Sequence, residues 1–386
     1  MTQPENTEPG ARRLMEGSEA IAEAAIAAGC RFFAGYPMTP FTELLEHFAK
    51  RLPEVEGGVC INAESELEAI GMAWGAAATG ARTATGSTGQ GLSLMQESLS
   101  EITRAEIPIV IFNMARGQGD YFQATRGGGH GDYRHIVLAP IDVAEAVELT
   151  QIAFHLADSW RHPVLIYGDY LLAHTSEAVS IERLDPTTRP ELRELKNKDW
   201  AVDGRLGGTG RSRNLNPIGM TKGKKGIDPE AFWGALQAKQ DRIEASEKRF
   251  EAESCEDAEL LVVAFGTLAR FARYVVRGLR AEGVRVGYFR PISLWPFPSE
   301  ALADAAEGVK RVACLEQNAG QMVDDVKLAI LGRAPVVSIG GISTDAAGFG
   351  IGPLMNAELI RQRVETTFSG GSVPAGVVSA SVGGAT

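Results

Sequence analysis

Short apolar runs alternate with longer segments in which apolar residues recur every three or four positions. The short runs, bounded by glycine and polar residues, are typical of buried strands, and the recurrence is typical of helices. In the first half of the chain this pattern predicts strands at 31–35, 58–61, 82–87, 108–114 and 163–167, together with helices at 18–28, 40–51, 65–79, 91–104 and 142–158. Such repeated alternation predicts a mainly parallel sheet with helices on both faces.

The pattern stops near residue 180 and returns at residue 258. It then predicts strands at 259–265, 284–289, 310–316 and 335–339, and helices at 268–281, 299–306 and 321–331. The sequence therefore indicates an α/β chain of two doubly wound, mainly parallel domains, at 1–179 and 257–345. Between them, residues 180–256 are expected to form a linker with a charged helical arm from about 229 to 253. Residues 346–386 are expected to form a C-terminal tail, whose last twenty residues are loose or cover a partner.

The composition is that of an ordinary soluble globular protein: 386 residues, a net charge of −11, 44% hydrophobic and 23% charged residues. No apolar run approaches the roughly 18 residues of a membrane span, and the polar N-terminus has no secretory signal. The one basic run, at 221–225, is short. We therefore expect a cytoplasmic protein that binds neither a membrane nor nucleic acid.

The four cysteines are dispersed, and no two form a Cys-x-x-Cys pair. This spacing argues against a disulfide framework, a zinc site or an iron–sulfur cluster bound by this chain alone. Cys30 and Cys314 lie among apolar residues and are expected in the core.

Three segments of unusual composition each follow a predicted strand. In the first, Thr39 and Pro40 are typical of an N-cap and the first residue of a helix. In the second, three acidic residues enter helix 65–79, which soon has no polar face and is expected to be buried. The third, 86–95, is a glycine-rich turn into a helix. Since ligands bind outside the carboxyl ends of the strands in such sheets, a functional site is expected here.

Residue types alone leave the roles of the candidates open. Thr39 fits a helix cap or, because a helix N-terminus with a hydroxyl binds anions, a contact to a carboxylate substrate. Arg116 fits a surface residue or a structural ion pair. Of the three acids, Glu66 shares its helix face with apolar residues only, whereas Glu64 and Glu68 lie in line with glycines. The helix dipole favours an acid at any of these positions, so spacing does not choose among them.

The segment Tyr36-Pro37-Met38-Thr39-Pro40 resembles the Tyr-Pro-Ile-Thr-Pro motif in the pyrimidine-binding domain of the alpha subunits of 2-oxoacid:ferredoxin oxidoreductases, which are thiamine diphosphate enzymes. The resemblance extends in order from about residue 15 to residue 330. Residues 290–298 and 316–322 are similar to the second domain of that family, which is like the carboxyl-terminal domain of transketolase.

This resemblance implies a role for each candidate. Glu66 corresponds to the carboxylate that hydrogen-bonds the aminopyrimidine ring of thiamine diphosphate, Thr39 faces the substrate, and Arg116 binds substrate oxygens by two parallel hydrogen bonds. Besides Glu66, the residues implied in cofactor binding are Tyr36, Pro37, Thr88, Gly89 and Gln90. His130 and His135 receive no role, and no residue is implied as a metal ligand.

The Gly-Asp-Gly motif, by which thiamine enzymes bind Mg²⁺ and the diphosphate, is absent. Gly-Asp occurs at residues 119–120, 131–132 and 168–169, but a tyrosine follows each time. The chain is thus expected to supply half of a thiamine site. The resemblance then assigns the diphosphate and Mg²⁺ to a beta subunit and the [4Fe-4S] clusters to partner chains, with gamma and ferredoxin-like delta subunits in a dimer of heteromers.

The favoured function is the alpha subunit of a 2-oxoacid:ferredoxin oxidoreductase, which converts a 2-oxo acid to acyl-coenzyme A and CO₂ and passes electrons to ferredoxin. The blocks at 118–123 and 294–298 look most like subunits acting on branched-chain 2-oxo acids or 2-oxoglutarate, and both substrates stay open. Two alternatives also stay open: a beta-type chain of a 2-oxoacid dehydrogenase or transketolase-like enzyme, and a non-catalytic α/β assembly subunit.

Overall fold

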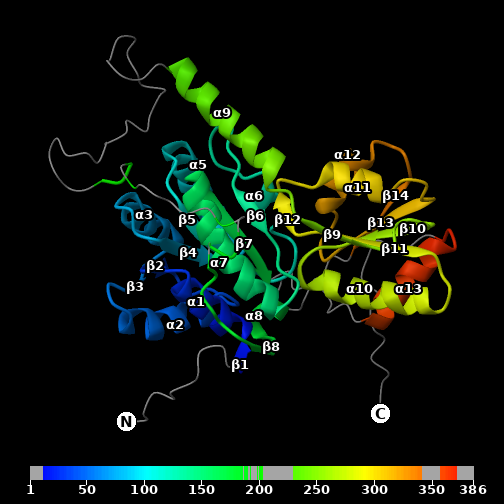
Figure 1. Cartoon of the computed structure of the whole chain (residues 1–386), viewed down its shortest axis with the longest axis horizontal. Coiled ribbons are helices and arrows are strands. Elements are labelled where there is room, and N and C mark those ends of the chain that lie inside the picture. The colour runs from blue at the N-terminus through cyan, green and yellow to red at the C-terminus, as the bar shows by residue number, and fades with distance from the viewer. Residues whose placement is uncertain are drawn as a thin grey trace, which may run out of the picture. The chain divides into compact units, whose positions relative to one another are not determined.

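The structure, a computed structural model, describes residues 12–185, 187–189, 192, 198, 200–202, 229–340 and 357–371. These residues form two compact units, each built on a sheet flanked by helices (Figure 1). The first unit comprises the described residues within Met1–Ala115, Phe122–Arg249 and Ile292–Phe297, and the second those within Arg116–Tyr121, Phe250–Pro291 and Pro298–Thr386. Two short segments, 116–121 and 292–297, therefore belong to a different unit from the residues that precede them in the chain.

The first unit contains a seven-stranded sheet in the order β12-β6-β7-β5-β4-β2-β3. Its strands are β2 (Phe32–Gly35), β3 (Val59–Asn62), β4 (Thr83–Ser87), β5 (Ile109–Ala115), β6 (Ile136–Leu138), β7 (Pro163–Asp169) and β12 (Ser293–Trp295). All pair in parallel except β12, which is antiparallel to β6. The five strands expected in this region and the mainly parallel α/β class are confirmed. The pattern missed β6 and β12 because three residues are too few to establish a period.

The helices of this unit are α1 (Gly17–Ala27), α2 (Thr42–Arg51) with the short η1 (Leu52–Glu54), α3 (Glu66–Ala78), α4 (Gln90–Leu94), α5 (Gln96–Ala105), α6 (Tyr121–Thr125, shared at its first residue with the second unit), α7 (Val143–Trp160), α8 (Tyr170–His174) and α9 (Pro229–Ser246). A separate antiparallel pair joins β1 (Arg13–Glu16) and β8 (Ser176–Val179). Two helices, α4 and α5, separated at Met95, follow β4, where one helix over 91–104 was expected.

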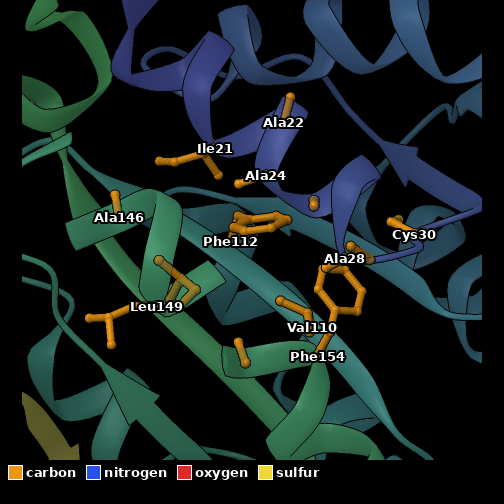
Figure 2. Packing of buried hydrophobic residues seen from close by; sticks show 14 of the residues in the cluster. Ile21, Ala22, Ala24, Ala28, Cys30, Val110, Phe112, Ala146, Leu149 and Phe154 are labelled. Carbon is orange, nitrogen blue, oxygen red and sulfur yellow. The ribbon is translucent and has the colours of Figure 1, made fainter. Parts of the chain in front are cut away.

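The main core lies between the sheet and helices α1 and α7 (Figure 2). Small alanines on α1 let it approach α7 closely, and larger side chains of β5 and α7 fill the space beside them. The labelled members are Ile21, Ala22, Ala24, Ala28 and Cys30 at and after α1, Val110 and Phe112 on β5, and Ala146, Leu149 and Phe154 on α7. Cys30 and Cys314 are buried, as expected of core residues.

Three local expectations were wrong. Thr39 does not cap a helix: the Phe41 N–H donates to the Met38 carbonyl at 2.7 Å, so Thr39 and Pro40 form a turn, with a cis peptide between them, and α2 begins at Thr42. The charged arm ends at Ser246 rather than near 253, because residues 250–253 pair with another strand.

Helix α3 is the third case, since it is buried on one face only. Ala69 packs on a small cluster with Ala34 and Ala63, whereas Leu67 and Met72 are 48% and 41% exposed. An apolar helix was expected to be covered all round. The described residues cover only the face that lies on the sheet.

The second unit contains a five-stranded sheet in the order β14-β13-β10-β11-β9. Its strands are β9 (Phe250–Glu253), β10 (Leu260–Val263), β11 (Val286–Pro291), β13 (Arg311–Glu316) and β14 (Val336–Gly340), and its helices are α10 (Gly266–Ala281), α11 (Ser299–Ala305), α12 (Met322–Ile330) and α13 (Ala357–Phe368). Only β9 runs antiparallel. The four strands and three helices expected here are confirmed. The basic run at 221–225 and the last fifteen residues lie outside the described part of the chain.

None of the helices in the described residues combines the length and apolar character that crossing a membrane requires.

Two buried histidines lie side by side at the amino end of the first sheet. His135 directly precedes β6 and His162 directly precedes β7, and these strands are parallel neighbours. Burial lowers the pKa of His135 to about 4, with a smaller effect from Arg134. Burial also lowers the pKa of His162 well below its usual value, with smaller contributions from Lys239 and His135. Both side chains are therefore neutral in the folded protein at physiological pH.

These pKa values predict that the free energy of unfolding decreases as the pH falls from about 6.5 towards 4. In this window the unfolded histidines bind protons and the folded ones do not, so acid favours the unfolded chain. At about 1.4 kcal/mol per pKa unit, His135 alone contributes on the order of 3 kcal/mol. Denaturant unfolding of His135→Gln should show a shallower dependence on pH across this window than the parent protein.

His130→Gln, which changes an exposed histidine of the same loop, is the control and should keep the parent's pH dependence. Equal slopes for His135→Gln and the parent would contradict the prediction.

Candidate functional site

The three segments singled out in the sequence meet at the carboxyl edge of the first sheet. Strand β2 lies between β4 and β3, with Gly35 opposite both Gly86 and Asn62. The chain therefore leaves these three strands at neighbouring points. The turn at 36–41 follows β2, helix α3 follows β3, and the glycine-rich turn at 88–91 follows β4.

Glu66 is the buried acid of this edge. It is the first residue of α3 and only 2% exposed, whereas Glu64 and Glu68 are exposed. The Ser87 hydroxyl, at the end of β4, donates to Glu66 Oε1 at 2.8 Å. Within the described residues Ser87 is the one hydrogen-bond partner of this carboxylate, which can accept about four hydrogen bonds. Its second oxygen is thus able to accept a hydrogen bond from a bound group.

Gly91 allows the following helix to approach Glu66. A Cβ at this position would lie 2.2 Å from Glu66 Oε1 and 2.0 Å from the Ser87 hydroxyl oxygen. No side chain larger than hydrogen fits there. The preceding Gly89 has a φ of 47°, a left-handed value that favours glycine. Close packing at position 91 and the positive φ at position 89 therefore explain why the turn contains glycine at these two positions.

Thr88 adds a polar group that makes no side-chain hydrogen bond to any residue that the structure describes. Its side chain is fully buried, and its hydroxyl makes no hydrogen bond within the described residues. A buried hydroxyl without a partner costs about 1–3 kcal/mol, so native proteins rarely keep one unless something else satisfies it. Because Thr88 follows Ser87 directly, this edge combines a buried carboxylate and a buried hydroxyl, both able to interact with a polar ligand.

The other predicted residues are divided between the two units. Tyr36 is half-buried, while Pro37, Thr39 and Gln90 are exposed, all at the same sheet edge as Glu66. Arg116 follows β5 but belongs to the second unit. The structure therefore brings the first group together with Glu66 in one unit, and it describes Arg116 in the other.

Pattern reasoning missed residues that shape this edge. The Gln123 amide donates to the Gly89 carbonyl at 3.1 Å and accepts from the Ser93 hydroxyl at 2.7 Å. Farther along, the Tyr133 hydroxyl donates to Gln96 at 2.7 Å, and the N–H groups of Gly128 and Gly129 donate to the tyrosine oxygen. The loop at 128–133 is thus hydrogen-bonded to Gln96, the first residue of α5. No local periodicity signals contacts between residues some thirty positions apart.

Family models match two adjoining parts of the chain. A model described as "Pyruvate flavodoxin/ferredoxin oxidoreductase, thiamine diP-bdg" matches residues 23–261. A second, described as "Pyruvate:ferredoxin oxidoreductase core domain II", matches residues 258–347. Together they cover residues 23–347, which include most of both structural units.

Curated relatives are similar over most of their length. The ketoisovalerate oxidoreductase subunit VorB of Methanothermobacter thermautotrophicus is 39% identical over 330 residues, which cover 83% of this chain and 90% of that protein. The 2-oxoglutarate synthase subunit KorA of the same organism is 36% identical over 350 residues, covering 84% of this chain and 92% of that protein.

Solved structures support the same relation. The 2-oxoglutarate:ferredoxin oxidoreductase from Magnetococcus marinus, determined with 2-oxoglutarate, coenzyme A and succinyl-CoA bound, matches with a TM-score of 0.74 and 25% identity, covering 95% of this chain and 68% of that one. A split-gene transketolase shares the fold alone, with a TM-score of 0.53 and 16% identity. The chain therefore belongs to the family of 2-oxoacid:ferredoxin oxidoreductase subunits that carry a thiamine diphosphate-binding domain.

Proposed function

We propose that this chain is the alpha subunit of a thiamine diphosphate-dependent 2-oxoacid:ferredoxin oxidoreductase, which decarboxylates a 2-oxo acid and yields acyl-coenzyme A, CO₂ and reduced ferredoxin. The observation that supports this most is the buried Glu66 carboxylate, with one hydrogen bond from Ser87 and no ion pair within the described residues. A buried charge is costly unless it is paired or serves a function.

The residues of the sheet edge fit the pyrimidine end of the cofactor. The open oxygen of Glu66 can accept a hydrogen bond from a ring nitrogen, and the unpartnered Thr88 hydroxyl can bond a second polar group. When bound, thiamine diphosphate supplies the carbon nucleophile and the electron sink for decarboxylation. The Glu66 carboxylate would hold a proton at the ring nitrogen of a bound pyrimidine and would so favour the imino form of the ring's amino group, which is the base that the cofactor would supply.

Arg116 and Thr39 are proposed to act on the substrate. A guanidinium binds a carboxylate or developing oxyanion by two parallel hydrogen bonds, which fixes both position and charge. Thr39 is exposed at the same edge as Glu66, in the turn after β2. Tyr36, Pro37, Gly89 and Gln90 are proposed to contact the cofactor.

The remaining parts of the reaction are assigned to other chains. The diphosphate and Mg²⁺ are proposed to lie on a beta subunit. The [4Fe-4S] clusters that deliver electrons to ferredoxin are proposed to lie on partner subunits, which include gamma and ferredoxin-like delta chains. Coenzyme A as acyl acceptor is supported by the bound ligands of the Magnetococcus marinus enzyme. The relatives are named for ketoisovalerate and for 2-oxoglutarate at similar identity, so we propose one of these two substrate classes. Turnover assays with both acids and pyruvate decide between them.

Glu66→Gln is predicted to lower turnover of the assembled complex by about a hundredfold or more. The amide keeps the shape but loses the charge that stabilises the imino form, and a buried catalytic charge contributes some 3–4 kcal/mol. Exchange of the thiazolium proton should slow in parallel. The variant should still fold, because the desolvation free energy lost on burying a neutral amide is smaller than that lost on burying a carboxylate.

Glu64→Gln and Glu68→Gln are matched controls, since both acids are exposed and lie on either side of Glu66 in the sequence. If either control slows proton exchange while Glu66→Gln does not, the wrong carboxylate has been chosen. If none of the three has an effect, the chain is a non-catalytic assembly subunit.

Arg116→Ala is predicted to lower kcat/KM for the 2-oxo acid by at least about tenfold, because one charge-assisted interaction contributes roughly 1.5–3 kcal/mol. Thiamine diphosphate content and proton exchange should stay at parent levels, since these depend on Glu66. Steady-state kinetics and cofactor analysis test this. Unchanged kinetics would mean that Arg116 has a structural role only.

A further inference from the structure

The carboxyl end of β13 in the second unit forms a rigid turn around a buried acid. Glu316 is fully buried, and its Oε2 accepts from the backbone N–H groups of Gln321 at 3.0 Å and Met322 at 2.8 Å. Its Oε1 accepts from the N–H of Val323 at 3.1 Å. Glu316 thus ties the end of the strand to the first turn of α12, and the peptide groups of 317–320 between them are fixed in place.

This turn binds the segment that follows β5. The chain ends β5 at Ala115, and residues 116–121 belong to the second unit. Gln118 is 1% exposed and uses all four of its hydrogen-bonding groups there. Its side chain donates to the Phe265 carbonyl at 2.9 Å and accepts from the Gln317 N–H at 3.0 Å. Its backbone N–H donates to the Gln317 carbonyl at 3.4 Å, and its carbonyl accepts from Asn318 at 2.8 Å.

Further contacts join the segment 116–121 to the rest of the second unit. The Gln321 amide donates to the Gly119 carbonyl at 2.9 Å. The fully buried Tyr121 donates to Asp325 at 2.6 Å and packs its ring 5.5 Å from that of Phe265, centre to centre. The blocks 118–123 and 316–322, which are far apart in the sequence, are therefore hydrogen-bonded to each other.

The composition of the segment explains why it needs such an anchor. Arg116 is followed by Gly117-Gln118-Gly119, and glycine has the largest conformational freedom to lose. A Cβ at Gly119 would meet nothing within 4 Å, so close packing does not require glycine there. On its other side Arg116 follows β5, whose last residue, Ala115, pairs with Asp169. The freedom that remains lies in the two glycines after Arg116, and the four hydrogen bonds of Gln118 reduce it.

We propose that Gln118 is a positioning residue for Arg116, by which the second unit sets the affinity of the enzyme for its 2-oxo acid. The inference rests on the proposed role of Arg116 in substrate binding. Gln118 does not itself touch the substrate. It acts by reducing the conformational freedom of the backbone two residues after the guanidinium, which lowers the entropy lost when that group binds a carboxylate.

The test is a double-mutant cycle in the assembled complex with Gln118→Ala, Arg116→Ala and the double variant. Gln118→Ala should lower kcat/KM for the 2-oxo acid about tenfold, mainly through a higher KM, with thiazolium proton exchange and cofactor content unchanged. The double variant should be no worse than Arg116→Ala alone, because an anchor has no function without the group it positions. Gln362→Ala, the same change at an exposed site of the second unit, should match the parent.

Tyr121→Phe provides a milder second variant if Gln118→Ala lowers complex stability. It keeps the ring packing, loses the hydrogen bond to Asp325, and should raise KM about threefold, again only when Arg116 is present.

Three outcomes separate the two claims. Non-additive losses support the positioning role. If Arg116→Ala impairs the enzyme but Gln118→Ala has no effect, or its effect adds in full to that of Arg116→Ala, the positioning role is wrong while the proposed function stands. If Arg116→Ala has no effect, the substrate role of Arg116 fails, and the inference fails with it.

Discussion

The burial of one carboxylate is the constraint on which the first unit's sheet edge depends. Removing Glu66 from water is costly, and within the described residues only the Ser87 hydroxyl compensates for it. That contact requires β4 to end beside the start of α3, and it requires glycine at position 91 so that the next helix can come close. The order of strands, the composition of the turn and the unpartnered Thr88 hydroxyl beside it are consistent with a site that is completed by a bound polar group.

The division into units does not follow the order of the chain. Residues 116–121 are bound by the second unit, and β12 completes the edge of the sheet in the first. Because each unit contains a segment flanked in sequence by the other, neither can be obtained by a single cut in the chain. Because of this exchange, Arg116, which is proposed to bind the substrate, belongs to the second unit, whereas Glu66 belongs to the first.

Much of the fold was predictable, since burial on both faces leaves a local signature in the sequence. Apart from β6, the parallel strands of both sheets are short apolar runs between glycines and polar residues, and they were found to within a few residues. Expectations failed where local preference competed with distant contacts. Thr39 and Pro40 have the residue types of a helix start but form a turn, and residues 250–253 continue a helical arm in composition yet pair with β11. The short β6 and β12 had no period to detect.

The sequence by itself determined the α/β class, the sheet edge at which the motifs gather and the set of candidate residues, because strand and helix periods and glycine-rich turns are local properties. Only the tertiary structure decided which of three neighbouring acids is buried. The helix dipole favours all three equally, and burial depends on Ser87 and Gly91, which come from another strand and another turn. It also decided that the backbone after Arg116 is bound by the second unit, since Gln118 and Gln317 are 199 positions apart and no local pattern relates them.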